Sequence, residues 1–207
     1  MQDPNPGGDS APRLNFPLHF ALLAGLVLLY LRVLARMDLG LGTALGGHLI
    51  FAFEGALYGL TIALALRAPA VMARRALFVV LSAACSVAAT HAGVWSRDGV
   101  EWLLARGGRE LSSRAEDTLA IAATAAFGAL AYGFLVRVLW LPRLRRTAPL
   151  LIALGCTAAM MVLAAAVSAE RNLEWFIVLW WLAFSAGLWG LSRWRGPADA
   201  RIRSSRA

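Results

Sequence analysis

The chain has 207 residues, of which 59% are hydrophobic and 15% are charged. Soluble domains average roughly 45–50% apolar and about 25% charged residues, and one core of this size could not hide so much apolar surface from water. These values exclude an ordinary soluble domain, and we predict an all-α, polytopic membrane helix bundle.

The net charge of +8 does not indicate a nucleic-acid partner. All 20 basic residues are arginines, and they gather at the ends of apolar stretches. A nucleic-acid-binding protein needs a soluble basic face instead. We therefore expect no nucleic acid among the partners, and we interpret the arginines as a sign of membrane topology.

The chain divides into a tail, a membrane domain and a second tail. Residues 1–13 are rich in Pro, Gly and Asp, which predicts a disordered N-terminal segment. A six-helix transmembrane domain is expected over residues 14–192, because six apolar stretches approach the length of about 20 residues that a span requires. The helices are predicted at 14–35, 43–66, 76–96, 116–140, 148–168 and 173–192. Residues 193–207 form an Arg-rich tail that we expect to bind anionic lipid in the cytoplasm.

The sizeable loop lies between the third and fourth stretches, at residues 97–115. Asp98 can cap a short helix that contains Trp102 and that Gly107-Gly108 would end. One side of this helix is apolar, so it could lie flat in the headgroup layer; an irregular loop is the alternative. Ser113 and Glu116 form a capping box at the start of the fourth helix.

The arginines also predict the orientation. With the N-terminus inside, the inner segments hold 13 arginines and the outer segments hold seven. The positive-inside rule then places both termini in the cytoplasm of a bacterial inner-membrane protein. Tryptophans typically mark the membrane interfaces. We expect Trp95, Trp102 and Trp175 at the outer interface and Trp140, Trp189 and Trp194 at the inner one.

A short pattern recurs in the second, fourth and sixth helices. In each, a phenylalanine precedes an aromatic-glycine pair at the same spacing: Phe53 with Tyr58-Gly59, Phe127 with Tyr132-Gly133, and Phe184 with Trp189-Gly190. The hypothesis is that three repeated hairpins pack around a common centre; chance recurrence is the alternative. Gly55 and Gly59 form a GxxxG motif, and we expect their face, which includes His48, to pack against another helix.

Ionisable residues within or near the apolar stretches are the candidate binding residues, because they are costly in a membrane and usually functional. They are Glu54, His48, His91, Arg32 and Asp117. Glu54 lies near mid-membrane, about 16 Å from its helix start. There it could pair with Arg32, bind a cation or carry a proton. His48 and His91 are expected at one level and within reach of each other, and His19 is expected at the inner interface.

We expect no resident cofactor and no metal. A metal site needs three or four ligands, and the chain has no ligand motif of that kind. Two histidines on neighbouring helices, His48 and His91, could instead bracket a haem iron, or each could hydrogen-bond a neighbouring helix. Cys85 and Cys156 lie in apolar runs without a CxxC motif, which is typical of small buried hydrophobes.

The sequence favours transport over catalysis. It has no nucleophile elbow, phosphate-binding loop or paired catalytic carboxylates. Repeated hairpins and a mid-membrane acid favour small-solute or ion transport, or a channel component. One alternative is an accessory or assembly subunit of a larger membrane complex, in which Trp180-Trp181 would contact a membrane protein partner. Another is an intramembrane haem or metal enzyme that uses His48 and His91. No substrate can be named from the residues.

Overall fold

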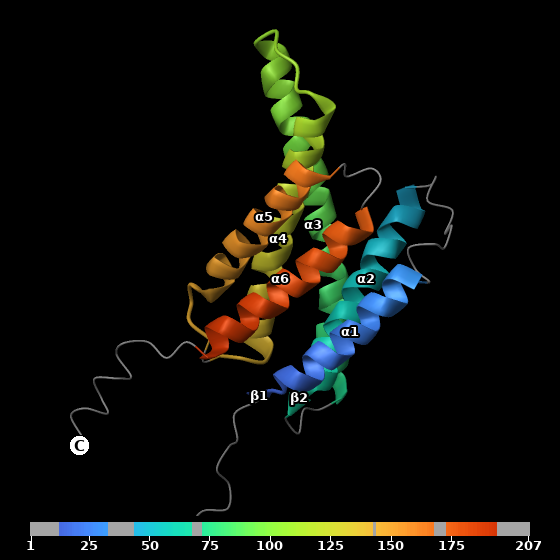
Figure 1. The fold of residues 1–207 in the computed structure, drawn as a ribbon, viewed down its shortest axis with the longest axis vertical. Coiled ribbons are helices and arrows are strands. Elements are labelled where there is room, and N and C mark those ends of the chain that lie inside the picture. The colour runs from blue at the N-terminus through green and yellow to red at the C-terminus, as the bar shows by residue number, and fades with distance from the viewer. Residues whose placement is uncertain (1–12, 33–43, 68–71, 143, 168–172, 194–207) are drawn as a thin grey trace, which may run out of the picture.

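In a computed structural model the described residues form a bundle of six helices (Figure 1). The structure describes residues 13–32, 44–67, 72–142, 144–167 and 173–193. The helices are α1 (Phe16–Arg32), α2 (Ala44–Ala65), α3 (Met72–Arg106), α4 (Ser113–Leu139), α5 (Ala148–Ala166) and α6 (Leu173–Arg193). Two short strands, β1 (Arg13–Leu14) and β2 (Leu66–Arg67), pair antiparallel. The prediction of an all-α bundle is confirmed.

Five of the helices, α2 to α6, are long and apolar enough to cross a membrane. The first helix, α1, is also apolar, but it has 17 residues, which is about 25 Å of helix against a hydrocarbon core of about 30 Å. The residues expected to complete it lie outside the described part of the chain. So do both predicted tails, apart from Arg13 and Arg193. The chain is a membrane protein by the length and composition of its helices.

Each helix packs against the next one in the chain, and α1 also packs against α6, so the bundle closes into a ring. Consecutive helices run in opposite directions (Figure 1). The end of the bundle that holds β1 and β2 is called the strand end here. At the opposite end, α1 finishes, α2 begins and α3 continues beyond its neighbours.

Two glycines bring α2 and α3 close together. A Cβ added at Gly55 would lie 2.5 Å from the Cβ of Ser86, and one added at Gly59 would lie 2.5 Å from the Cβ of Ser82. Contacts this short do not occur between real side chains, so this approach depends on glycine. His48 lies on the same face of α2 and also touches α3. The prediction that this face packs against a helix is confirmed.

Aromatic side chains from α2, α4 and α6 fill the centre of the bundle. Tyr58 lies 5.7 Å from Tyr132 between ring centroids and stacks on Trp181 at 5.9 Å. Trp180 stacks on Phe184 at 5.4 Å. Buried aromatic pairs of this kind contribute about 0.5–1.5 kcal/mol each beyond their buried area. These five residues are called the aromatic cluster below.

The predicted repeat fits α2 and α4 but not α6. In α2 and α4 the tyrosine of the pattern is buried and the following glycine makes a tight contact with the next helix. In α6, Trp189 is 39% exposed and Gly190 has no neighbouring atom within 4 Å of an added Cβ. Phe184 is buried, whereas Phe53 and Phe127 are exposed. The third copy is therefore wrong, because α6 turns a different part of the pattern inward.

The third helix is longer than predicted and replaces most of the expected loop. It runs unbroken over residues 72–106, so the prediction of a separate short helix or an irregular loop is wrong. Arg97 supports the continuous helix by pairing with Asp98 at 3.0 Å and with Glu101, one turn on, at 3.4 Å. The helix ends before Gly107-Gly108 as predicted, with Gly108 at a positive φ of 66°. At 35 residues it is about 52 Å long, so part of it projects beyond the other helices (Figure 1).

Two local predictions are also corrected. Ser112, not Ser113, caps α4, and its Oγ accepts a hydrogen bond from the N–H of Ala115 at 3.4 Å. Trp140, expected at the inner interface, is 1% exposed. Its ring packs against Phe78 at 5.9 Å and under the Arg74 guanidinium at 5.0 Å. Tryptophan at a helix end therefore does not always face the lipid.

Candidate functional site

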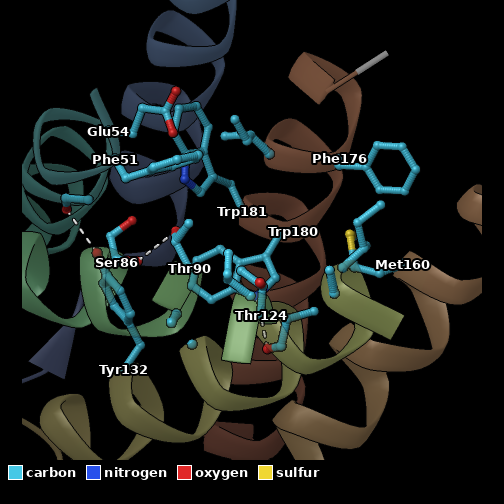
Figure 2. Close-up of a pocket in the computed structure, with 18 residues that line it drawn as sticks. Phe51, Glu54, Ser86, Thr90, Thr124, Tyr132, Met160, Phe176, Trp180 and Trp181 are labelled. Atoms are coloured by element: carbon cyan, nitrogen blue, oxygen red, sulfur yellow. Dashed lines mark hydrogen bonds between the residues drawn. The ribbon is translucent and has the colours of Figure 1, made fainter. Parts of the chain in front are cut away.

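A partly open cavity of about 230 Å³ lies between helices of the bundle (Figure 2), and its lining residues lie between the aromatic cluster and the end opposite the strands. Five helices, α2 to α6, contribute to its wall. Large apolar and aromatic side chains form most of it: Phe51, Met160, Phe176, Trp180 and Trp181. Its polar side chains are Glu54, Ser86, Thr90, Thr124 and Tyr132. This composition is typical of a small-molecule site, in which a few polar groups orient an apolar ligand.

Glu54 carries the only charged group of this wall among the described residues. Its side chain comes from the middle of α2, and the residue is 5% exposed. The hydroxyl of Tyr30, on α1, donates a hydrogen bond to the carboxylate. A carboxylate has about four acceptor positions, and within the described part of the chain Tyr30 occupies one of them. The sequence predicted Glu54 as a site residue but did not identify Tyr30.

The hydrogen-bond donors around the cavity are directed at backbone carbonyls. These bonds run from Tyr132 to Gly55 and Ser82 (2.9 and 2.8 Å), from Thr90 to Ser86 (3.1 Å), and from Trp180 to Ala125 (3.2 Å). Figure 2 shows them as dashed lines where both partners are drawn. These three donors are engaged with the backbone, so the cavity offers its ligand the Glu54 carboxylate, aromatic surface and the hydroxyls of Ser86 and Thr124.

A second group of polar side chains lies on the other side of the aromatic cluster, toward the strand end. His19 places its Nε2 2.9 Å from the Ser185 Oγ, and the Tyr58 hydroxyl lies 2.8 Å from the same oxygen. The Thr61 hydroxyl is 3.4 Å from the His19 Nδ1. His19 is 0% exposed, so its expected interfacial position is wrong. The cause is the packing of α1 against both α2 and α6, which encloses this face of α1.

A sequence signal for this buried face exists, although it is weak. His19 shares a stripe with Leu23, Leu26 and Tyr30, spaced as one face of a helix requires, and all four residues are buried. In an apolar helix this stripe is as hydrophobic as the lipid-facing side, so hydrophobicity alone does not identify it as the buried face. The polar residues at the two ends of the stripe, His19 and Tyr30, were the sequence feature that could have indicated the buried face of α1.

His48 and His91 contact each other. Their ring centroids are 4.6 Å apart, and the rings are tilted by 40°. Their expected proximity is therefore confirmed. Within the described residues, no group of three or more His, Cys, Asp or Glu side chains could hold a metal ion. A haem between the two histidines requires a porphyrin to separate the imidazoles, so the contacting rings would first have to move apart.

The remaining two candidates lie away from the cavity. Arg32 is exposed at the last residue of α1, and Asp117 is partly exposed in the first turn of α4. Neither belongs to the cavity wall. The predicted binding residues thus separate into one cavity residue, Glu54, one histidine pair and two residues near the end of the bundle.

Comparison of the chain with protein-family models, with curated proteins and with solved structures finds no match. The function proposed below is therefore argued from the cavity and the bundle that surrounds it.

Proposed function

We propose that this chain is a multi-pass protein of a bacterial inner membrane that binds a small solute in its cavity and takes part in moving that solute across the membrane. It would act as a carrier or as a channel component. The observation that carries the proposal is the position of Glu54 in the wall of a mostly apolar cavity inside a membrane bundle. A buried acid in a membrane helix is costly and usually functional.

The aromatic cluster supports transport by a moving barrier. Its rings are packed against one another between the cavity and the strand end. A solute in the cavity can reach the strand end only if these rings separate. A binding site near mid-membrane with a closed barrier on one side is the arrangement that alternating access requires.

The charge distribution supports an orientation with both termini in the cytoplasm. Among the described residues, the strand end has no acidic residue and holds eight arginines: Arg13, Arg67, Arg74, Arg75, Arg137, Arg145, Arg146 and Arg193. The opposite end holds five, Arg32, Arg97, Arg106, Arg109 and Arg114, together with the acidic residues Asp98, Glu101, Glu110, Glu116, Asp117 and Glu174. By the positive-inside rule the strand end faces the cytoplasm, where its arginines would bind anionic lipid headgroups.

The proposal is tested by filling the cavity. Ala120 lines the cavity, so Ala120→Phe would occupy part of its volume. Ala88, on α3, is exposed on the bundle surface, and Ala88→Phe is the matched control. Purified variants are reconstituted into liposomes, and uptake of radiolabelled benzyltrimethylammonium and phenylacetate is measured against protein-free liposomes.

We expect wild type and Ala88→Phe to take up at least one of these solutes. Ala120→Phe should reduce that uptake by about tenfold or more, because overpacking and lost space both oppose binding. If wild type takes up neither solute, or if Ala120→Phe transports as well as wild type, the cavity is not a transport site.

A specific observation also favours the accessory-subunit alternative. The last turns of α3 expose Trp102 and Leu103, and exposed apolar residues in a projecting element can contact a protein partner. Pull-down from membranes with wild type and Leu103→Asp distinguishes this alternative. A partner that is lost in the variant supports an accessory role, whereas transport by the purified chain alone argues against it.

A further inference from the structure

The cavity is the right size for one ring with a short substituent. An apolar protein cavity of about 150 Å³ accommodates benzene. The present cavity has about 230 Å³, which leaves room for a ring and a short polar group. An inorganic ion that loses its hydration water would instead need polar partners on all sides, and this wall is mostly apolar.

The charge of the cavity wall determines whether a cationic or an anionic ligand is favoured. Glu54 is its one charged residue, and the described wall contains no arginine or histidine. The ion pairs shown among the described residues, from Arg97 to Asp98 and Glu101, lie on the projecting part of α3. Among the described residues Glu54 has no ion pair. A buried carboxylate in that state is costly, and a cationic ligand would supply the positive partner. An anion would meet the carboxylate with no basic group to offset it.

The aromatic side chains favour a cation in the same way. Phe51 precedes Glu54 by one helical turn on α2, and Trp181 contacts Tyr30, the hydrogen-bond partner of Glu54, at 5.3 Å between ring centroids. Aromatic faces attract cations, most strongly when the pair is shielded from water. Figure 2 shows Glu54 and Phe51 at one side of the cavity and Phe176 and Met160 at the other.

The two sides of the cavity therefore differ in chemistry. One side has the carboxylate and aromatic rings, and the other has Met160, Phe176 and Ala125, which pack together in an apolar group. A ligand with a cationic head and an apolar body matches both sides at once. Neutral apolar molecules match only the second side.

We propose that the cavity binds a small organic monocation, a ring-sized amine with its ammonium group at Glu54 and its apolar body against Met160 and Phe176. This inference rests on the proposed function, since it names the class of solute for the same cavity. The ammonium donates hydrogen bonds to the carboxylate, and the rings of Phe51 and Trp181 line the same cavity.

The test compares three probes that share a ring and differ in charge: 2-phenylethylamine, 2-phenylethanol and phenylacetate, at pH 7. Binding to the purified full chain in detergent is measured by isothermal titration and by the shift in melting temperature. The variants are Glu54→Gln, which keeps the size and removes the charge, and Ala120→Phe, which fills the cavity. Asp117→Asn is the matched control, because it removes a carboxylate that lies outside the cavity wall.

We expect the amine to bind wild type and Asp117→Asn about tenfold or more tightly than the alcohol does, the range for one charged hydrogen bond. Phenylacetate should bind least. Glu54→Gln should remove the difference between amine and alcohol, and Ala120→Phe should weaken both. If Glu54→Gln does not fold, the preference of the wild-type protein for the amine over the alcohol is a sufficient test by itself.

The outcomes separate the two proposals. If the amine and the alcohol bind wild type equally, or if phenylacetate binds best, the cation inference is overturned while the cavity remains a solute site. The cation inference is also overturned if Glu54→Gln folds and still binds the amine more tightly than the alcohol. If none of the probes binds wild type, both the cation inference and the proposed use of this cavity are overturned.

Discussion

Single glycines set the distance between neighbouring helices in this bundle, and their effect can be measured residue by residue. Gly59 is packed against Ser82 on α3, so Gly59→Ala must push the two helices apart. We expect a loss of about 1–3 kcal/mol in the free energy of unfolding from overpacking. Unfolding in mixed detergent, followed by circular dichroism, measures it.

The control for this prediction is Gly155→Ala on α5, where an added Cβ meets no atom within 4 Å. Alanine is a better helix former than glycine by up to about 1 kcal/mol, so this variant should be unchanged or slightly more stable. Equal effects of the two substitutions would show that glycine packing does not hold α2 and α3 together.

The sequence could identify some site residues but not their partners. Glu54, His48 and His91 stand out because each is a rare ionisable residue in an apolar stretch, and the depth of each follows from counting along its helix. The contact between His19 and Ser185 joins residues 166 positions apart. It depends on α1 packing against α6, which helix periodicity cannot reveal. Tyr30 was missed because its hydrogen bond to Glu54 depends on how α1 is rotated against α2.

At the scale of the helices, we predict that the end of α3 extends out of the membrane into water. A nitroxide spin label at Leu103, an exposed position near the end of α3, should be reached by a water-soluble relaxation agent. The control label is at Val80, an exposed position inside the predicted span 76–96, which should be reached by dissolved oxygen instead. This difference follows from a helix of about 52 Å in a hydrocarbon layer of about 30 Å.

The alternative for this segment is a helix lying flat in the headgroup layer. In that case the Leu103 label would sit at the membrane boundary, and it would respond to both agents at an intermediate level. Such a result, with Val80 unchanged, would contradict the continuous helix that projects from the bundle.

Hydrophobicity predicted the bounds of α2, α5 and α6 within a few residues. It did not predict the bounds of α3, which continues ten residues beyond its expected end at residue 96. Asp98 and Gly99 resemble a helix start, because Asp is a common N-cap and Gly weakens a helix by about 1 kcal/mol. In the structure, the ion pair from Arg97 to Glu101 spans this point and the helix continues. A side-chain pair one turn apart contributes about 0.2–0.5 kcal/mol, which offsets part of the cost of Gly99 but not all of it.

For the whole molecule, the ring of helices matters more than the predicted threefold repeat. The buried tyrosines of α2 and α4 meet at the centre, 5.7 Å apart, and α6 contributes tryptophans to the same place. Two copies of the pattern therefore describe real packing, while the third is an outward-facing coincidence at Trp189. A sequence repeat predicts spacing along a helix, but the rotation of that helix depends on all its neighbours.

The orientation of the bundle in the membrane is the remaining prediction, and it decides from which side a solute reaches the cavity. Single cysteines are introduced at Arg109 and Arg146, both exposed, in a chain with Cys85 and Cys156 replaced by alanine. A membrane-impermeant maleimide should label the Arg109→Cys variant in intact cells and the Arg146→Cys variant only after lysis. The inner segments keep their excess of arginines in both variants, because only one of 20 is removed each time, so the positive-inside rule predicts no change of topology.

The reverse labelling pattern would contradict this orientation, and labelling of both sites in intact cells would contradict a crossing of the membrane by α4. The expected pattern has a consequence for the solute. With residue 109 outside, the cavity lies in the outer half of the bundle and the aromatic cluster lies between it and the cytoplasm. A cation would then enter from outside, bind at Glu54, and reach the cytoplasm only after the rings of Tyr58, Tyr132 and Trp181 separate.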